Sequence, residues 1–265
     1  MSRRPDFTGT GPYLSVIIPA YNEERRLQNS LEHVVAYLDR QPFSSEVLVV
    51  DDGSTDATTS IARNYAGEHA TVRILTYTPN CGKGHAVRIG MAEAHGQLML
   101  LCDADLSTPI EDVEKLLPWV QDGYDVVIGS RALPDSDLRV HQPWLRERLG
   151  RMFNLVVRVL GVRGFADTQC GFKLFTRRAA RGIFPRLFTD RWAFDVEALL
   201  VAQMMGYRIR EVPVTWVNAP GTKVDVVRDA CTTLRDLLRI RTAYLLRRPR
   251  RRLIIEETAP FARSK

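Results

Sequence analysis

The clearest indication of the fold is the sequence QLMLLCDAD at residues 97–105. An apolar run of this length followed directly by acids is typical of a strand that is buried on both faces and ends at polar chemistry. Asp103 and Asp105 alternate along an extended segment, so a bend of the backbone there brings both carboxylates toward one point. Two unpaired acids after a buried run repel each other unless a cation lies between them.

Carboxylate oxygens without His or Cys are the ligands that Mg²⁺ or Mn²⁺ prefers, usually together with waters and phosphate oxygens. The sequence therefore predicts a divalent metal held by Asp103 and Asp105. The alternative is that these side chains only cap the helix expected to begin near Pro109.

Short β-rich runs alternate with helical patterns on both sides of this segment, which is typical of βαβ units. Strands are predicted at Leu14–Pro19, Glu46–Asp51, Val72–Tyr77, Gln97–Asp103, Asp125–Gly129 and Arg208–Val214. Helices are predicted at Glu23–Asp39, Ser54–Tyr65, Lys83–Ala94, Ile110–Gln121 and Phe194–Met205, the first with Asn22 as its N-cap. The expected fold class is α/β: one domain at residues 12–225, a mainly parallel sheet with helices on both faces, followed by a basic helical extension at 226–265.

Polar loops follow three of the predicted strands, at Pro19–Glu23, Asp51–Asp56 and Asp103–Asp105. Ligands of open α/β sheets bind at the carboxyl edge of the strands, so these loops predict one common site. Each loop taken alone also fits ordinary turn and capping chemistry.

A fourth segment, Asn80–His85, places two glycines and Lys83 at a predicted helix start, where backbone amides and a cation can meet phosphate. A plain glycine turn is an equally good interpretation. The segment matches neither the Walker pattern nor the dinucleotide fingerprint, which argues against a dehydrogenase.

Composition excludes several classes of protein. The chain has 265 residues, 45% apolar and 26% charged, which excludes a disordered polymer or a disulfide scaffold. The four cysteines are isolated, so we expect a reducing compartment and no zinc site. No apolar run approaches the ~20 residues that a spanning helix needs. The net charge of +6 resides in the tail, since Lys223–Lys265 holds 12 basic and 5 acidic residues.

Four ordered motifs resemble glycosyltransferase family 2: PAYNEE at 19–24, VVDDGSTD at 49–56, GKGHAVRIGM at 82–91 and DADLST at 103–108. Three later blocks resemble the dolichyl-phosphate β-glucosyltransferase branch in particular: GSRAL at 129–133, DTQCGFKLF at 167–175 and RWAFDVEALL at 191–200. The resemblance covers residues 13–225 and implies the Rossmann-like GT-A fold.

The resemblance implies roles for the residues that match the motifs. Pro19, Tyr21 and Glu23 would hold the uracil and ribose of a nucleotide-sugar, with Asp52 and Ala104 beside them. Asp103 and Asp105 would act in catalysis through a metal that bridges the two phosphates. Lys83 would add to this clamp.

In the polyprenyl-phosphate glycosyltransferases that the chain resembles, arginines in the region around Arg131 hold the lipid phosphate. The resemblance therefore implies that Arg131 binds the acceptor. Further candidates are Arg146, Arg151, Gln169 and Lys223. Arg146 and Arg151 fall in a stretch, 145–160, whose apolar residues keep helical spacing and which either packs on the domain or lies at a membrane surface. Asp167 and Lys173 are pocket candidates without an assigned role.

The leading hypothesis is an inverting, metal-dependent transfer of glucose from UDP-glucose to a polyprenyl phosphate. Such an acceptor is largely dianionic at neutral pH and needs little help from a base. The alternatives are another donor, GDP-mannose or UDP-N-acetylhexosamine, or a glycan hydroxyl acceptor with Asp195 or Glu197 as base. A non-enzyme alternative, binding of nucleic acid by the arginine run at 247–252, is disfavoured because the domain itself is near neutral.

A membrane role is expected for the extension. Residues 226–244 interleave apolar residues with arginines, which favours an anionic membrane surface or packing on the domain. We therefore expect a cytoplasmic protein, peripheral on the cytoplasmic face of a membrane, that binds no nucleic acid, with a homo-oligomer as an open alternative to a monomer.

Overall fold

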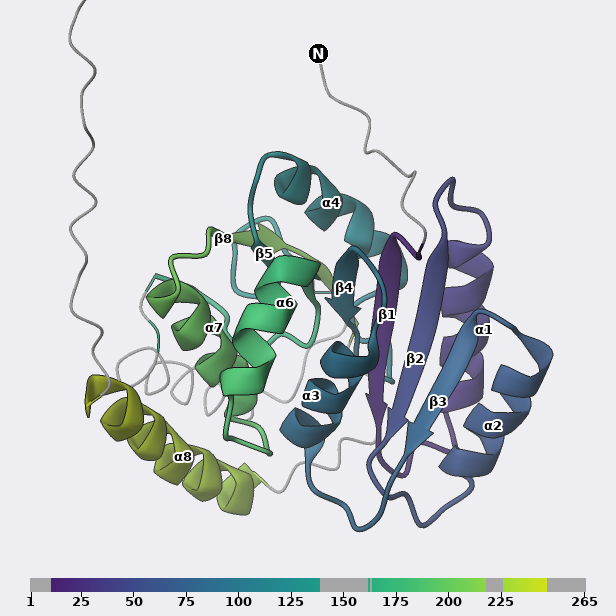
Figure 1. Ribbon diagram of the computed structural model, residues 1–265, viewed down its shortest axis with the longest axis horizontal. Coiled ribbons are helices and arrows are strands. Elements are labelled where there is room, and N and C mark those ends of the chain that lie inside the picture. Colours follow the sequence, from purple (N-terminus) through teal and green to yellow (C-terminus); the bar gives the residue numbers. More distant parts are fainter. Residues whose placement is uncertain (1–10, 139–161, 163, 218–225, 247–265) are drawn as a thin grey trace, which may run out of the picture.

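The computed structural model describes residues 11–138, 162, 164–217 and 226–246. Its core is a seven-stranded sheet in the order β3-β2-β1-β4-β7-β5-β8 (Figure 1). The strands are β1 Leu14–Ala20, β2 Ser45–Asp51, β3 Val72–Thr76, β4 Leu98–Leu101, β5 Val126–Ser130, β7 Lys173–Thr176 and β8 Ile209–Pro213. A second, two-stranded sheet joins β6 (Asp137–Leu138) to β9 (Thr215–Trp216).

The sheet is mainly parallel, as the sequence predicted, with one exception. The β1–β2, β1–β4, β2–β3 and β5–β8 pairs are parallel, whereas β7 runs antiparallel to both β4 and β5. The four-residue strand β7 was not predicted, because KLFT is short and begins with a lysine. It is the strand that joins β4 to β5 and so connects the two halves of the sheet.

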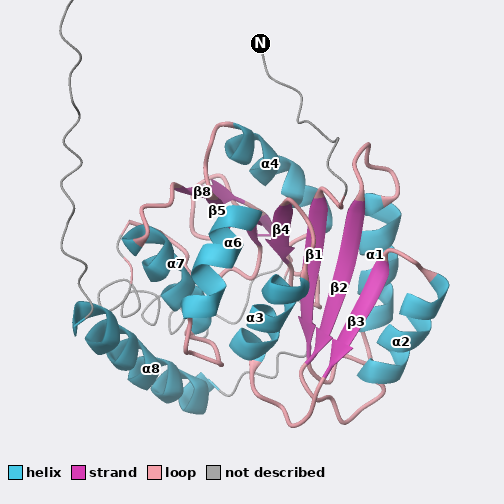
Figure 2. Ribbon diagram, in the orientation of Figure 1, coloured by secondary structure: helices cyan, strands magenta, loops and turns pink. Residues whose placement is uncertain are grey.

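Helices cover both faces of the sheet (Figure 2). Their bounds are α1 Leu27–Leu38, α2 Thr58–Glu68, α3 Lys83–Glu93, α4 Val113–Gln121, α6 Arg177–Ile183, α7 Phe194–Met204 and α8 Val226–Leu246, with short 3-10 turns η1 Ile110–Asp112 and η2 Phe184–Arg186. On β1, Ile17 joins one apolar cluster with α3, α6, α7 and α8, while Val16 and Ile18 join the other with α1, α2 and α4. Alternation along the strand thus divides the core into two layers.

The first helix begins later than predicted. Its first residue is Leu27 and its N-cap is Arg26, whereas Asn22 has a φ of 55° and caps no helix. The Asn22 side chain instead accepts a hydrogen bond of 2.7 Å from the Thr55 backbone N–H, which links the loops after β1 and β2. The prediction of Asn22 as N-cap was wrong because asparagine suits left-handed turns as well as caps.

The helix expected in the extension is present as α8. One face packs on the domain through Leu237, Ile240 and Tyr244, whereas Leu234 and Leu238 remain 40% and 50% exposed. Within the residues that the structure places, no helix combines the length and apolarity needed to cross a membrane.

Candidate active site

A cleft of about 480 Å³ opens at the carboxyl edge of the sheet. The donor-side residues predicted from the sequence all line it: Pro19, Tyr21, Glu23, Asp52, Lys83, Asp103, Ala104 and Asp105. Arg131, Gln169 and Asp195 line the same cleft, so it also contains three of the predicted acceptor-side and catalytic residues. Arg146, Arg151 and Lys223 lie outside the described residues.

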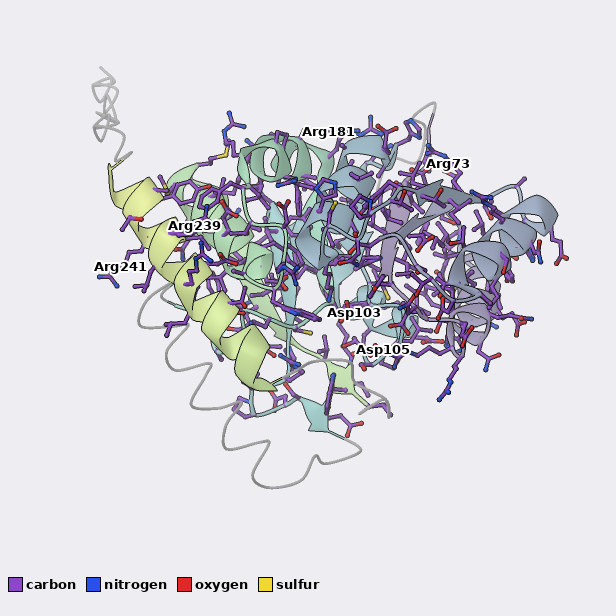
Figure 3. The ribbon with its side chains drawn as sticks, turned by 90° about the horizontal axis from the view of Figure 1, so that it is seen from below. Arg73, Asp103, Asp105, Arg181, Arg239 and Arg241 are labelled. Atoms are coloured by element: carbon purple, nitrogen blue, oxygen red, sulfur yellow. The ribbon has the colours of Figure 1, made fainter. Side chains whose placement is uncertain are left out.

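The two aspartates that follow β4 lie near the middle of this edge (Figure 3). Asp103 accepts a 2.6 Å hydrogen bond from the Lys83 ammonium. Asp105 accepts a 2.9 Å bond from the backbone N–H of Ser107, and its other oxygen is 3.9 Å from an Arg26 guanidinium nitrogen. Each carboxylate therefore has a partner and keeps further lone pairs toward the cleft.

The donor set fits a magnesium-type or manganese-type ion. The described residues contain no cluster of three or more His, Cys, Asp or Glu side chains around one point, so this part of the chain offers two carboxylates and no complete set of metal ligands. Mg²⁺ is typically held by one or two carboxylates, with the remaining ligands from water and substrate phosphates. Burial opposes the charged form of Lys83, but Asp103, Asp195 and Asp105 together raise its pKa. The Lys83 ammonium therefore stays charged beside these carboxylates.

Position 171 fixes the place of Asp103. A Cβ atom on Gly171 would lie 2.0 Å from Asp103 Oδ2, far inside contact distance. The carboxylate therefore lies directly against the backbone that precedes β7, and only glycine leaves room for it.

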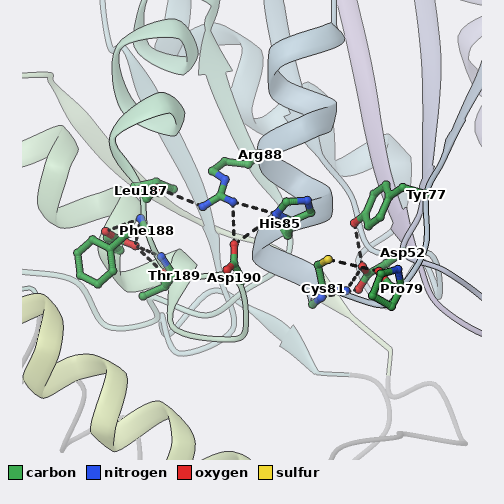
Figure 4. Close-up of polar contacts among 12 residues, drawn as sticks. Asp52, Tyr77, Pro79, Cys81, His85, Arg88, Leu187, Phe188, Thr189 and Asp190 are labelled. Carbon is green, nitrogen blue, oxygen red and sulfur yellow. Dashed lines mark hydrogen bonds and ion pairs between the residues drawn. The ribbon is translucent and has the colours of Figure 1, made fainter.

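Asp52 organises the loop that follows β3. Its carboxylate accepts four hydrogen bonds of 2.8 Å, from the Tyr77 hydroxyl, the Asn80 amide and the backbone N–H groups of Cys81 and Gly82 (Figure 4). Asp52 lines the cleft, as predicted, but its oxygens are used within the chain. Its contribution to the site is thus the shape of residues 77–82.

Two backbone amides at the start of α3 are also used within the chain. Gly82 N–H bonds to Asp52, and His85 N–H donates to the backbone oxygen of Asp190 at 3.1 Å. A Cβ atom at Gly84 would lie 2.8 Å from the Thr189 oxygen. The two glycines therefore admit a neighbouring loop, and the interpretation that this segment meets phosphate stays a prediction.

Arg131 and Asp167 form a two-pronged ion pair. Arg131 Nε and Nη2 donate to the two Asp167 oxygens at 2.6 and 3.0 Å, and the Arg131 backbone N–H donates as well. Asp167 is 1% exposed; burial raises its pKa, but the Arg131 guanidinium outweighs this and lowers it to about 2. Arg131 keeps one edge on the cleft, with the Trp216 ring centroid 5.9 Å from its guanidinium carbon.

Asp195 pairs with a lysine that is itself buried. Lys173 Nζ, on a side chain 1% exposed, donates to Asp195 Oδ1 at 2.5 Å and to the Cys170 oxygen. Burial raises the pKa of Asp195, and the charges of Lys173 and Lys83 oppose that rise. Asp195 is the second residue of α7, whose N-cap is Ala193, so Asp195 is not the helix cap. Its side chain lines the cleft.

Comparison with known proteins now adds to this geometry. The family model described as glycosyl transferase family 2 matches residues 15–208. The chain belongs to glycosyltransferase family 2. It is similar to proteins named dolichyl-phosphate beta-glucosyltransferase, with 41% identity to that of Dictyostelium discoideum (88% of this chain, 75% of the relative) and 39% to that of Homo sapiens (88% and 76%).

Solved structures agree on the GT-A glycosyltransferase fold. Glucosyl-3-phosphoglycerate synthase from Mycobacterium tuberculosis superposes with a TM-score of 0.64 at 19% identity, over 91% of this chain and 85% of that one. Mannosyl-3-phosphoglycerate synthase from Rubrobacter xylanophilus gives 0.66 at 21%, over 94% and 79%. The predicted fold class and the predicted family are therefore confirmed, and the enzyme is a glycosyltransferase.

Sequence reasoning missed several residues in the cleft of this family 2 glycosyltransferase. Arg26, Arg191, Trp192 and Trp216 all line it. Arg191 and Trp192 open the RWAFDVEALL block, so the motif was noticed but these two side chains were given no role. Trp216 follows the last strand of the main sheet, where no motif marks it.

Proposed function

We propose that this glycosyltransferase moves glucose from UDP-glucose to a polyprenyl phosphate such as dolichyl phosphate, with inversion at the anomeric carbon and with Mg²⁺ or Mn²⁺. The observation that carries the proposal is the cleft, in which residues of three motifs meet Asp103 and Asp105 of a fourth motif and an arginine, Arg131. The relatives' name supports the sugar and the lipid acceptor. The Mycobacterium tuberculosis enzyme, crystallised with Mn²⁺ and UDP-glucose, supports the donor and the metal.

Asp103 and Asp105 would hold the metal between them and the donor diphosphate. When bound, the ion neutralises the charge that grows on the leaving nucleoside diphosphate. Lys83, held at Asp103, is placed to share that charge as the sugar–phosphate bond breaks. Pro19, Tyr21 and Glu23 would then position the nucleoside at the ends of β1 and β2.

Arg131 is the described arginine proposed for the acceptor phosphate. Its pair with Asp167 fixes the guanidinium plane at the cleft, and a rigid guanidinium suits a phosphate better than a mobile one. Gln169 lies in the same wall of the cleft. Arg146, Arg151 and Lys223 remain candidates from the sequence alone.

A phosphate acceptor makes a protein base unnecessary, because its oxygen is already ionised at neutral pH. Catalysis then consists of positioning the acceptor opposite the leaving group and stabilising charge. In that scheme Asp195 is the counter-charge of the buried Lys173 and accepts no proton from the acceptor. Transfer to a glycan hydroxyl would instead require Asp195 to accept the proton of that hydroxyl.

The exposed side of α8 suggests where the acceptor is met. Leu234 and Leu238 stand out beside Arg235 and Arg239, and α8 lies at the end of the molecule to which β1, β2 and β3 point (Figure 1). Apolar side chains among arginines favour an anionic membrane surface, at about 1 kcal/mol per basic residue near the surface. We place the protein on the cytoplasmic face, peripherally attached, with its cleft toward the lipid.

The test is a panel of nucleotide-sugars with Mn²⁺ or Mg²⁺ and a short polyprenyl phosphate. We expect UDP-glucose to be consumed and the lipid to gain one β-linked glucose. Consumption only with a hydroxyl acceptor, or a preference for GDP-mannose, would replace the proposal by one of its alternatives.

A substitution at one of the two aspartates tests the proposed metal site. Asp105→Ala should lower kcat at least a hundredfold, because it removes one of two protein ligands, and EDTA should abolish turnover of the unmodified enzyme. Asp122→Ala, on an exposed residue at the end of α4, is the matched control and should keep full activity. Undiminished turnover in EDTA would exclude the metal.

A further inference from the structure

The segment Leu187–Trp192, between η2 and α7, contributes two residues to the wall of the cleft. Arg191 and Trp192 line the cleft, and the Trp192 ring centroid lies 5.5 Å from Lys83 Nζ. Because Lys83 is bonded to Asp103, the position of this segment bears directly on the donor side of the site. The question is what holds it in place.

One side of the segment is held by α3. The backbone oxygen of Asp190 accepts from His85 N–H, and Gly82 and Gly84 let the two backbones approach, since a Cβ at Gly82 would lie 2.5 Å from that oxygen. The Arg88 guanidinium donates to the Leu187 backbone oxygen at 3.1 Å and to the Asp190 carboxylate at 2.7 Å (Figure 4).

The other side is held by Glu197, whose side chain is completely buried. Its carboxylate accepts from the backbone N–H of Phe188 at 3.1 Å, from the N–H of Thr189 at 2.9 Å and from the Thr189 hydroxyl. The remaining donor is the Tyr244 hydroxyl of α8, at 2.8 Å. A buried carboxylate is costly unless donors surround it, so these partners are tied to one another through Glu197.

Glu197 is therefore unsuited to be the base that the sequence allowed. It has no exposed surface and its oxygens face the segment and α8, whereas Asp195, two residues earlier, lines the cleft. The same motif thus supplies one acid to the cleft and one to its support.

We propose that Glu197 and Tyr244 are positioning residues that hold the Leu187–Trp192 segment, and with it Arg191 and Trp192, against the donor side of the cleft. In this arrangement the packed face of α8 helps to hold the wall of the cleft, while its other face remains exposed. The inference about donor binding rests on the proposed function; the physical tie does not.

The test is Tyr244→Phe in the full chain, which removes one hydroxyl and keeps the ring that stacks on Phe188 at 5.9 Å. Thr242→Val is the matched control, because the Thr242 hydroxyl is exposed and donates only to carbonyls of its own helix. Hydrogen–deuterium exchange of the peptide covering 187–192 is measured for both variants, together with kcat and KM for UDP-glucose and the affinity for UDP with Mn²⁺.

We expect Tyr244→Phe to speed exchange at Phe188 and Thr189 and to raise the KM for UDP-glucose and the Kd for UDP about threefold to tenfold, the usual effect of one hydrogen bond. kcat should change less than KM, and Thr242→Val should match the unmodified chain. Glu197→Gln, which keeps the shape but loses one acceptor, should show a larger effect of the same kind.

Unchanged exchange at 187–192 in both Tyr244→Phe and Glu197→Gln would overturn the tie. Faster exchange with an unchanged KM and Kd would overturn its role in donor binding. An unmodified chain that binds no uridine nucleotide would instead contradict the proposed function, while the exchange comparison would still decide whether Tyr244 and Glu197 hold the segment.

Discussion

The space and the hydrogen-bond partners around a side chain in this cleft limit its role as much as its own functional group does. Asp103 can lie against the chain before β7 only because position 171 has no side chain. Asp52, which the motif assigns to the nucleotide, uses its oxygens on its own loop. The chemistry of a motif residue therefore depends on neighbours that the motif does not contain.

Gly171→Ala should lower the kcat of glucosyl transfer at least tenfold and weaken activation by Mn²⁺, because the added methyl group displaces the Asp103 carboxylate. The measurement is a Mn²⁺ titration of initial rates. Gly67→Ala, in α2, is the control, since a methyl group there meets nothing within 4 Å. Equal activation curves for the two variants would contradict the close approach.

The Arg131–Asp167 pair predicts a pH dependence of stability. The folded pKa of Asp167, about 2, lies below its ordinary value of 3.8, so the pair contributes above about pH 4 and is lost as the pH falls toward 2. The contribution is on the order of 2 kcal/mol. Urea unfolding between pH 2 and 5 should show a smaller pH slope for Asp167→Asn than for Asp122→Asn, the exposed control. Identical slopes would show that the pair adds nothing to stability.

At the scale of elements, long periodic segments were predicted and short or special ones were not. The helices α2, α3, α4 and α7 and the strands β1 to β5 and β8 lie near their predicted positions, because periodic burial marks them, whereas β6, β7 and β9 were not predicted. β7 was missed because Lys173, at its start, is buried by pairing with Asp195, a contact that no local pattern reveals. The Leu187–Trp192 wall was missed for the same reason, since loops are positioned by distant partners.

Helix α3 provides an element-scale prediction, because it packs closely on β1. A Cβ at Gly90 would lie 2.4 Å from Ile17 Cγ2, so Gly90→Ala should overpack this contact. We expect a loss of about 1–3 kcal/mol in the free energy of unfolding, despite alanine's better helix propensity. Urea denaturation measures it, with Gly67→Ala again the control; a gain in stability at position 90 would show that α3 shifts freely.

At the scale of the whole molecule, the sequence predicted the α/β class, the family and the clustering of the polar loops at one edge. It did not predict how α8 meets the rest of the chain, because an amphipathic pattern with arginines fits both packing and membrane contact. The structure shows packing on one face and exposed leucines on the other, with Arg241 at the outer edge of the molecule (Figure 3).

The exposed leucines predict vesicle binding. Leu234→Asp with Leu238→Asp should reduce co-sedimentation with phosphatidylserine vesicles at least tenfold and leave binding of UDP unchanged, because neither side chain contacts the cleft. Met204→Asp, which adds an acid to an exposed apolar position of α7, is the control. Equal sedimentation of the double variant and the unmodified chain would exclude α8 as the membrane contact.

The antiparallel strand β7 has a consequence for how the enzyme comes into being. It is the strand that joins β4, which Asp103 and Asp105 follow, to β5, which Arg131 follows. When residues 1–172 have been synthesised, the strands β1 to β5 are present. The strand β7, which pairs with both β4 and β5, is not yet made. The position of Asp103 relative to Arg131 is therefore set late in synthesis, by a strand of four residues. A chain interrupted before Lys173 would lack that strand and also the cleft residues that follow it: Arg191, Trp192, Asp195 and Trp216.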